Sequence, residues 1–259
     1  KGKKSVIKRR KYGGSVSELK QYMGERIGTG GNATVYLLKD PNNNKVIKVF
    51  KDVEQTAHIF ESAIKLNILN SAYFPKFYTY KIEDGEITFD VLLELKSPKN
   101  YIIMDFINGN NIEDFLESKL TLSMKLKIFK EICVAVKLLH DNNLFHGDLK
   151  PGNIMITPTS DADLTKEFTF SIVIIDLDCV ETQFKKPCST GQGTPGYMIP
   201  FGSIDNFTNK DKDKYKIELQ KYKDIFSLAC ILLRFLCSQS KVYINDIWEV
   251  KDALGFYWR

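Results

Sequence analysis

Strand patterns and helical patterns occupy different parts of this chain. Alternating apolar and polar residues, rich in β-branched and aromatic types, predict strands at 24–27, 34–39, 46–50, 76–82, 87–95 and 101–106. A short lead-in helix is expected over 17–23. Over 53–69 the apolar residues recur every three or four positions, which predicts one amphipathic helix among the strands. The first part of the chain is therefore expected to form a small antiparallel sheet with one main helix.

Helical periodicity dominates beyond Gly109. Long helices are predicted over 122–140 and 222–237, with two short strands at 154–156 and 171–175 between them. The sequence thus predicts an α+β fold of two lobes. We expect a basic tail at 1–16, a sheet-rich lobe at 17–106 and a helix-rich lobe at 107–259. Ligands commonly bind in the cleft between such lobes.

Composition excludes several classes of protein. The hydrophobic fraction of 43% and the charged fraction of 27% are those of an ordinary globular chain. The longest apolar stretch runs from Phe226 to Cys237 and contains Arg234, whereas a transmembrane helix needs about 18 apolar residues. No membrane partner is expected. The five cysteines form no CxxC pair, which indicates reduced thiols in an intracellular protein of the cytoplasm, the nucleus or both.

The positive charge is concentrated at one end of the chain. The formal net charge is +5, yet residues 1–11 hold seven Lys and Arg residues and no acidic residue, so the remainder carries −2. Such a tail is able to contact nucleic acid, an anionic membrane or a nuclear import receptor. A solvated extension without a partner is the favoured interpretation, because such basic runs are common.

The strongest chemical signal is the loop His146-Gly-Asp-Leu-Lys-Pro-Gly-Asn153, which directly follows the first long predicted helix. Asp148 is able to accept a hydroxyl proton or orient a hydroxyl group. Lys150 is able to neutralise a transferring phosphoryl group. Asn153 offers an oxygen ligand to a hard cation. This combination of residues favours a phosphoryl-transfer site over a plain loop.

Three weaker signals fit the same chemistry. Asp176 ends an apolar run, where a carboxylate is able to hold Mg²⁺, although turn or N-cap aspartates look the same. The glycine-rich segment 28–35 joins two predicted strands and could cradle phosphates, although a plain hairpin turn is as good an interpretation. Lys48 shares a strand face with Val46 and could hold phosphates, although alone it reads as a solvent-facing lysine.

Together these motifs resemble the eukaryotic-type protein kinase family in their order and spacing, over residues 24 to about 240. Residues 104–107 resemble the hinge of that family. Residues 193–200, GTPGYMIP, resemble its substrate-docking loop. Residues 224–229 resemble its anchor helix, whose aspartate, here Asp224, holds the catalytic loop backbone.

The resemblance implies a function and a role for each motif residue. The expected activity is transfer of the γ-phosphoryl group of ATP to Ser or Thr hydroxyls of proteins, with Mg²⁺, or Mn²⁺ in its place, as the cation. Asp148 would be the base or hydroxyl positioner, and Lys150 would steady the γ-phosphate. Lys48 would hold the α- and β-phosphates and pair with Glu61, while Thr194 would belong to the acceptor arrangement. Asn153 and Asp176 would bind the metal. The nucleotide would contact Ile27, Gly28, Gly30, Gly31, Val35, Val46, Met104, Met155 and the backbone of Asp105 and Ile107.

The chain also departs from the family pattern. Ala33 replaces the third loop glycine, Gly147 replaces an arginine, Asp178 replaces a glycine, and Phe201 replaces a glutamate. The helical lobe is short after the anchor helix. Because Gly147 offers no charge to a phosphate on the activation segment, we expect constitutive activity. The acid that pairs with Lys48 is ambiguous, because family spacing leads to Lys65, whereas Glu61 lies one turn earlier on the same face.

Two other functions share parts of this pattern. The HGD and DLD variants also occur in small-molecule kinases of the aminoglycoside and choline type, but Lys150 and the GTPGYMIP segment favour a protein substrate. A catalytically dead nucleotide-binding scaffold is disfavoured because the four essential polar groups are present.

The short helical lobe and basic tail also resemble compact kinases of large DNA viruses, of the baculovirus type. That likeness implies basic or nucleic-acid-associated substrates, and the short lobe suggests self-association or a partner.

Overall fold

The computed structural model describes residues 15–39, 44–51, 56–94, 99–116, 120–158, 168–177, 181–182, 193–199 and 209–236. The chain divides into two units, Lys1–Ser71 with Pro75–Phe106, and Ala72–Phe74 with Ile107–Arg259. Most of the predicted tail at 1–16, together with Asp178 and Phe201, lies outside the described residues.

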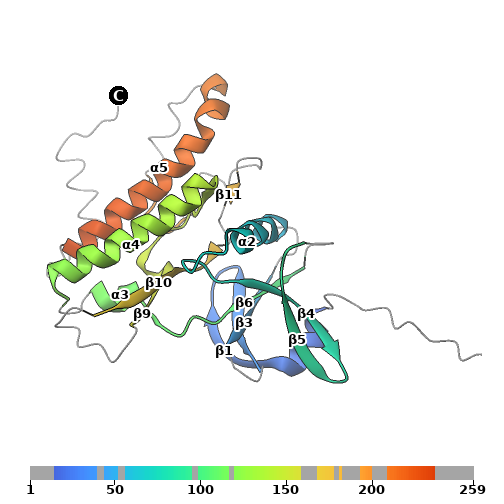
Figure 1. Ribbon diagram of the computed structural model, residues 1–259. Helices are drawn as coiled ribbons and strands as arrows, with labels where there is room; N and C mark the ends of the chain where they lie inside the picture. Colours follow the sequence, from blue (N-terminus) through green and yellow to red (C-terminus); the bar gives the residue numbers. More distant parts are fainter. Residues whose placement is uncertain are drawn as a thin grey trace, which may run out of the picture. The chain divides into compact units, whose positions relative to one another are not determined.

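The first unit is built on a six-stranded sheet in which every neighbouring pair is antiparallel (Figure 1). The strand order is β1-β2-β3-β6-β4-β5. The strands are β1 (Met23–Thr29), β2 (Ala33–Leu38), β3 (Lys45–Phe50), β4 (Phe77–Glu83), β5 (Glu86–Val91) and β6 (Tyr101–Asp105). The predicted small antiparallel sheet is therefore confirmed.

One face of this sheet carries an apolar core. The buried side chains of Leu19, Leu38, Ile47, Tyr80, Tyr101 and Ile103 form one cluster. Leu19 comes from the short helix α1 (Val16–Leu19), which continues as the 3-10 turn η1 (Lys20–Tyr22). The expected lead-in helix thus breaks into two short pieces, and its role is to supply Leu19 to the core.

The main helix of the first unit is α2 (Ala57–Leu69), which ends at Asn70 in the left-handed conformation that often terminates helices. A buried side chain, Asn67, ties it to the sheet. The Asn67 amide donates to the carbonyl of Phe77 at 2.8 Å and to that of Leu92 at 2.7 Å, and its oxygen accepts from the Phe77 N–H at 2.9 Å. Two hydrogen bonds therefore fix the end of α2 against Phe77 of β4, and a third fixes it against Leu92, just after β5.

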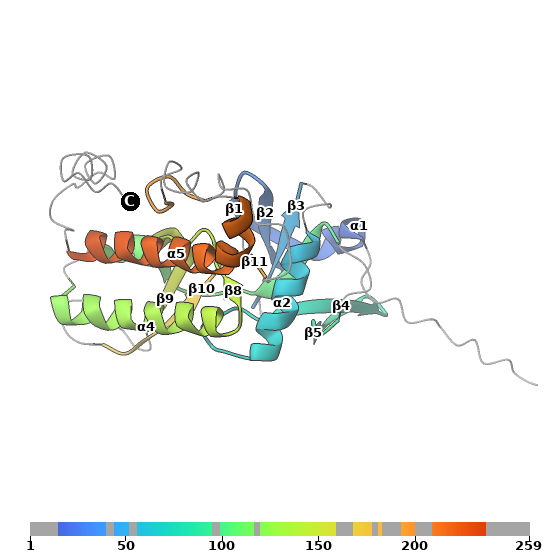
Figure 2. The same ribbon diagram turned by 90° about the horizontal axis from the view of Figure 1, so that it is seen from above.

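Long helices dominate the second unit. Both views show α4 (Leu122–Asp141) and α5 (Asn209–Leu236) lying side by side (Figures 1 and 2). Met124, Ile128, Ile132 and Leu139 are fully buried and lie on one stripe of α4. Lys125, also buried, donates from Nζ to the carbonyl of Phe235 at 3.0 Å. This bond satisfies one of the last carbonyls of α5, which have no donor within the helix.

Short elements complete the second unit. The helices α3 (Ile112–Leu116) and η2 (Pro151–Asn153) are single turns. One small sheet has the order β10-β9-β7, and a second pairs β11 with β8. Their strands are β7 (Asn110–Asn111), β8 (Leu144–Phe145), β9 (Ile154–Pro158), β10 (Phe170–Ile174) and β11 (Glu181–Thr182). The predicted α+β architecture, with a sheet-rich unit and a helix-rich unit, is confirmed. Within the described residues, none of the helices combines the length and the apolar character that crossing a bilayer requires.

Candidate active site

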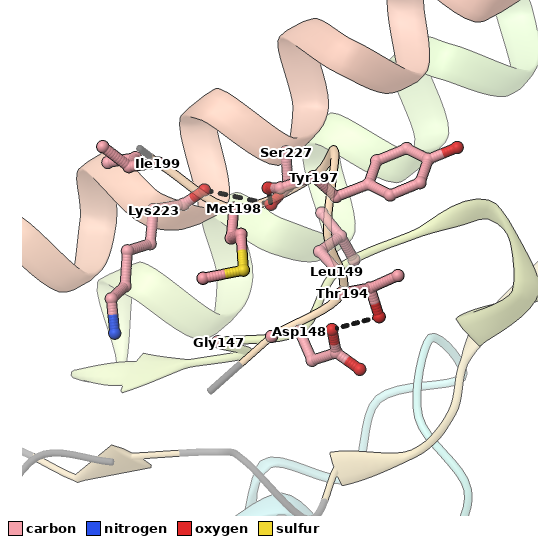
Figure 3. A pocket seen from close by; sticks show the side chains of 10 residues that line it. Gly147, Asp148, Leu149, Thr194, Tyr197, Met198, Ile199, Lys223 and Ser227 are labelled. Atoms are coloured by element: carbon pink, nitrogen blue, oxygen red, sulfur yellow. Dashed lines mark hydrogen bonds between the residues drawn. The ribbon is translucent and has the colours of Figure 1, made fainter. Parts of the chain in front are cut away.

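The loop between β8 and β9 places Asp148 at one corner of a triangle of polar groups. Its Oδ1 accepts from the hydroxyl of Thr194 at 2.8 Å (Figure 3). Its Oδ2 accepts from Lys150 Nζ at 3.0 Å. Lys150 Nζ also donates to Thr194 Oγ1, at 2.8 Å. The structure thus brings together three predicted site residues, of which Thr194 is distant in sequence.

Asn153 is turned so that its oxygen is available to a cation. Its Nδ2 donates to the carbonyl of Asp148 at 2.9 Å, which leaves Oδ1 facing away from that bond. Asn153 is only 5% exposed, and its carbonyl accepts from the N–H of Ile175 at 2.9 Å. Because Asp176 follows Ile175, the two predicted metal ligands lie on backbone segments that are bonded to each other.

The donor set fits a divalent cation of the hard type. A carboxylate from Asp176 and an amide oxygen from Asn153 are the ligands that Mg²⁺ prefers, and Mg²⁺ usually completes its shell with substrate phosphates and water. The described residues contain no cluster of three or more His, Cys, Asp or Glu residues that would form an all-protein metal cage. Asp176 adopts a positive φ of 60°, an uncommon conformation for a non-glycine residue.

Asp224 of α5 holds the start of the catalytic loop. It is fully buried, and its carboxylate accepts from the N–H groups of His146 and Gly147, each at 2.9 Å. A third contact, also at 2.9 Å, joins Asp224 to Nε2 of His140. The expectation that Asp224 anchors the loop backbone is confirmed. Both N–H groups of the loop are thereby satisfied away from water.

His146 links Asp148 to the segment that carries Asp176. The ring is fully buried. Its Nε2 lies 3.1 Å from the carbonyl of Ile175, and its Nδ1 accepts from the N–H of Asp148 at 3.3 Å. Since a carbonyl only accepts, Nε2 carries the proton and Nδ1 is the acceptor, which assigns a neutral ring. Sequence reasoning had included His146 only as the first residue of the loop.

Two residues of α5 hold the segment 193–199. The hydroxyl of Ser227 donates to the carbonyl of Tyr197 at 2.6 Å, and Arg234 donates to the hydroxyl of Tyr197. Arg234 also bonds Oε1 of Glu113 at 2.8 Å. Burial raises the pKa of Tyr197 despite its contact with Arg234, so the phenol stays protonated. Sequence reasoning assigned no such role to Ser227, Arg234 or Glu113.

A pocket opens on the second unit beside Asp148 (Figure 3). It lies between the start of the catalytic loop, the segment 193–199 and α5. Its lining consists of Gly147, Asp148, Leu149, Gly193, Thr194, Tyr197, Met198, Ile199, Lys223 and Ser227. The site therefore offers both a hydroxyl-binding carboxylate and a recess next to it.

Strand register aligns the predicted nucleotide residues of the first unit. Val35 lies opposite Gly28 on one side and Lys48 on the other, and Val46 lies opposite Met104. Directly opposed residues share a face of the sheet, as do alternate residues of one strand. Gly28, Val35, Val46, Lys48 and Met104 therefore share the face opposite to the Leu19 core. Lys48 is 9% exposed, so it is not the solvent-facing lysine that its strand alone suggested.

The glycine-rich turn between β1 and β2 is held by its backbone. The N–H of Gly30 donates to the carbonyl of Ala33 at 2.9 Å, and Lys51 Nζ donates to the carbonyl of Gly31 at 2.6 Å. A methyl group added at Gly31 would meet nothing within 4 Å. Ile27, just before the turn, is 43% exposed. These residues are positioned as the predicted phosphate loop, and their contact with a nucleotide stays a prediction.

Other predicted residues are only partly defined by the structure. The N–H of Asp105 donates to the carbonyl of Lys76 at 3.0 Å, which leaves the Asp105 carbonyl as its backbone group for adenine. Met155 lies in β9 of the second unit. Ile107 is the first residue of the longer of the two segments that form that unit. Glu61 lies on α2 and is exposed. Its pairing with Lys48 stays a prediction.

One further polar group lies near a predicted nucleotide residue. Asn111 of β7 is directly opposite Met155 of β9. The side-chain oxygen of Asn111 is buried and has no hydrogen-bond partner within the part of the chain that the structure describes. Sequence reasoning missed Asn111, because a single asparagine in the run GNN carries no periodic or spacing signal.

Comparison with known proteins places these observations in one family. The family model described as "Protein kinase domain" matches residues 22–253. Among curated proteins, the chain is 27% identical over 217 residues to a probable serine/threonine-protein kinase zyg-1 of Caenorhabditis briggsae, covering 82% of this chain and 26% of that protein. It is 23% identical over 232 residues to the serine/threonine-protein kinase PknB of Mycobacterium tuberculosis, covering 84% of this chain and 32% of that protein. The chain thus spans about a quarter to a third of the length of these relatives.

A solved structure shows the same fold. The crystal structure of a Stt7 homolog from Micromonas algae, soaked with ATP, matches with a TM-score of 0.60 at 16% sequence identity, over 91% of this chain and 75% of that one. The protein kinase family implies ATP and a divalent metal ion as cofactors and proteins as substrates. Because the family model covers most of the residues, from η1 to beyond α5, this chain belongs to the protein kinase domain family.

Proposed function

We propose that this domain transfers the γ-phosphoryl group of ATP to Ser and Thr hydroxyls of proteins. The observation that carries the proposal is the triangle of Asp148, Lys150 and Thr194, in which a carboxylate already accepts a hydrogen bond from an aliphatic hydroxyl at 2.8 Å. The serine/threonine kinases among its relatives support the same activity.

Each residue of the triangle has a task that its geometry supports. Asp148 Oδ1 is placed to accept a hydrogen bond from an acceptor hydroxyl and to orient its oxygen for attack. Lys150, bonded to the other carboxylate oxygen, supplies positive charge where phosphoryl charge develops. Asn153 holds the backbone of Asp148 through its amide N–H, so the carboxylate is oriented before the substrate arrives.

The cofactors supply the remaining chemistry. ATP is the phosphoryl donor, and the cation when bound neutralises charge on its phosphates. We propose Mg²⁺ as that cation, with Mn²⁺ able to replace it, and Asn153 and Asp176 as the residues that hold it. Lys48 and the turn containing Gly28, Gly30 and Gly31 would bind the phosphates, through an ammonium and backbone N–H groups.

Aliphatic hydroxyls suit this site better than phenols. The Thr194 side chain and Lys150 close two sides of the Asp148 carboxylate. A short Ser or Thr side chain brings its oxygen close to the peptide backbone, as Thr194 does here, whereas a tyrosine ring holds its hydroxyl several ångströms farther out. Because the matching family model is that of protein kinases, a small-molecule acceptor has no comparable support.

The finer identity of substrates and partners remains a proposal. Basic or nucleic-acid-associated substrates, an intracellular location and a viral origin stay predictions from the sequence. Self-association through α5 is supported by Tyr222, Ile225, Leu233 and Leu236, each more than 40% exposed. Sedimentation at several protein concentrations tests it, and a monomer at the highest concentration would contradict it.

The activity is tested with a matched pair of carboxylate variants. Asp148→Asn should keep ATP affinity but lower turnover by about two to four orders of magnitude, because the acceptor hydroxyl loses its carboxylate partner. Asp141→Asn, at the exposed end of α4, is the control and should leave turnover unchanged. Transfer is measured on casein and histone with labelled ATP, followed by phosphoamino-acid analysis. Near-parental turnover of Asp148→Asn, or mainly phosphotyrosine, would contradict the proposal.

A further inference from the structure

A buried lysine lies in the pocket next to the proposed reaction centre. Lys223 precedes Asp224 on α5, and only 8% of its surface is exposed. It lines the same pocket as Asp148 and Thr194 (Figure 3). Its carbonyl accepts from Ser227, but its ammonium has no hydrogen bond or ion pair within the part of the chain that the structure describes.

The charge of this ammonium is not balanced by its neighbours in the pocket. Among the lining residues, Asp148 is the acidic one. Both of its carboxylate oxygens already bind other groups, since Oδ1 binds Thr194 and Oδ2 binds Lys150. The remaining lining side chains are apolar or neutral. Because the Lys223 side chain is mostly enclosed and its ammonium has no ionic partner among the described residues, an anion that enters the pocket would find a counter-charge there.

The position of the pocket indicates which anion would reach it. In Figure 3 the Lys223 side chain runs beside Met198 and points away from Ile199, while Asp148 and Thr194 lie on the other side of Met198. A peptide with its acceptor hydroxyl at Asp148 would pass this opening. An extended chain advances about 3.3 Å per residue, so the side chain that enters belongs to a residue close to the acceptor.

We propose that this pocket binds an anionic side chain of the substrate, within about two residues of the Ser or Thr that is phosphorylated, and that Lys223 determines this specificity. The inference rests on the proposed function and names its substrate class. Carboxylates and phosphorylated side chains share the required chemistry. A basic side chain at the same position is rejected, because it would meet the Lys223 ammonium.

The test uses serine peptides that differ at one position, from two residues before the acceptor to two residues after it. Each position carries Asp, phosphoserine, Gln or Lys in turn. The intact protein should show, at one position, at least about tenfold higher kcat/KM for an anionic residue than for Gln, and the lowest value for Lys. Comparison of Asp with phosphoserine distinguishes an acidic from a previously phosphorylated substrate.

Variants connect this preference to Lys223. Lys223→Gln should remove the preference, Lys223→Glu should shift it towards Lys peptides, and Lys223→Arg should keep it. Lys221→Gln, on the same helix and outside the pocket lining, is the matched control and should behave like the parent. Thermal melting establishes that each variant is folded. If Lys223→Gln does not fold, retention of the preference by Lys223→Arg and its shift in Lys223→Glu still decide the matter.

A binding measurement separates failure of this inference from failure of the proposed function. Fluorescence anisotropy on peptides in which Ala replaces the acceptor Ser reports the preference without transfer. Equal affinity for the Asp, phosphoserine and Gln peptides, or a preference that survives in Lys223→Gln, would overturn the role of Lys223. Transfer to none of the serine peptides, with anion-dependent binding intact, would instead overturn the proposed activity.

Discussion

Replacement of Asp224 by Ala should destabilise the second unit strongly. The carboxylate accepts from two backbone N–H groups, those of His146 and Gly147, and contacts Nε2 of His140. Its side chain is 1% exposed, so water cannot readily take its place. An unsatisfied buried donor costs about 1–3 kcal/mol. Loss of partners for two N–H groups and one ring therefore predicts a loss of about 3–9 kcal/mol, a large part of the roughly 5–15 kcal/mol typical of a domain.

Urea denaturation, followed by circular dichroism and intrinsic fluorescence, measures this loss as a shift in the midpoint. Asp141→Ala is the matched control, because its pair with Lys137 lies at the surface of α4, with side chains 56% and 70% exposed. That pair should contribute at most about 0.5 kcal/mol. Asp224→Asn should lie between the two, because an amide turns an N–H₂ group towards one of the backbone donors. A loss below about 1 kcal/mol in Asp224→Ala would refute the anchoring role.

Three further outcomes are expected. Gly109→Ala should lower the melting temperature by several degrees, because its methyl group would lie 2.6 Å from the carbonyl oxygen of Ile156, whereas Gly31→Ala meets nothing within 4 Å and should melt like the parent. Arg234→Met should raise the KM for peptide several-fold with little change in the KM for ATP, because it releases Tyr197 and the segment that lines the pocket; an unchanged peptide KM would contradict this. Chelation with EDTA should abolish transfer and excess Mg²⁺ should restore it, so transfer that persists in EDTA would refute the cation requirement.

Strands and helices with a long apolar periodicity were predictable from the sequence. Short strands that form only by pairing with a distant segment were not. The strands of the six-stranded sheet and helix α4 have strong local patterns, and their predicted and observed positions agree to within a few residues. The strands β7, β8 and β11 are two residues long and exist only because a distant segment pairs with them. Helix α5 begins at Asn209 rather than near 222, because its first half is so polar that it shows no apolar periodicity.

The same distinction applies to the site. The loop from His146 to Asn153 was recognisable because its chemistry is contained in eight consecutive residues. The contacts of Thr194 with Asp148 and of Ser227 with Tyr197 join residues that are 46 and 30 positions apart. No local pattern specifies such contacts, because they depend on the fold that brings α5 beside the catalytic loop.

Gly147 shows how the backbone explains a departure from the family pattern. Its φ is 76°, in the region that favours glycine, and its N–H is held by Asp224 at 2.9 Å. This position therefore contributes a backbone donor and an unstrained turn rather than a side-chain charge. The nearby segment 193–199 is held by Ser227 and Arg234 of α5. Because residue 147 has no side-chain charge to pair with a phosphate, activity without phosphorylation of the activation segment stays the prediction drawn from the sequence.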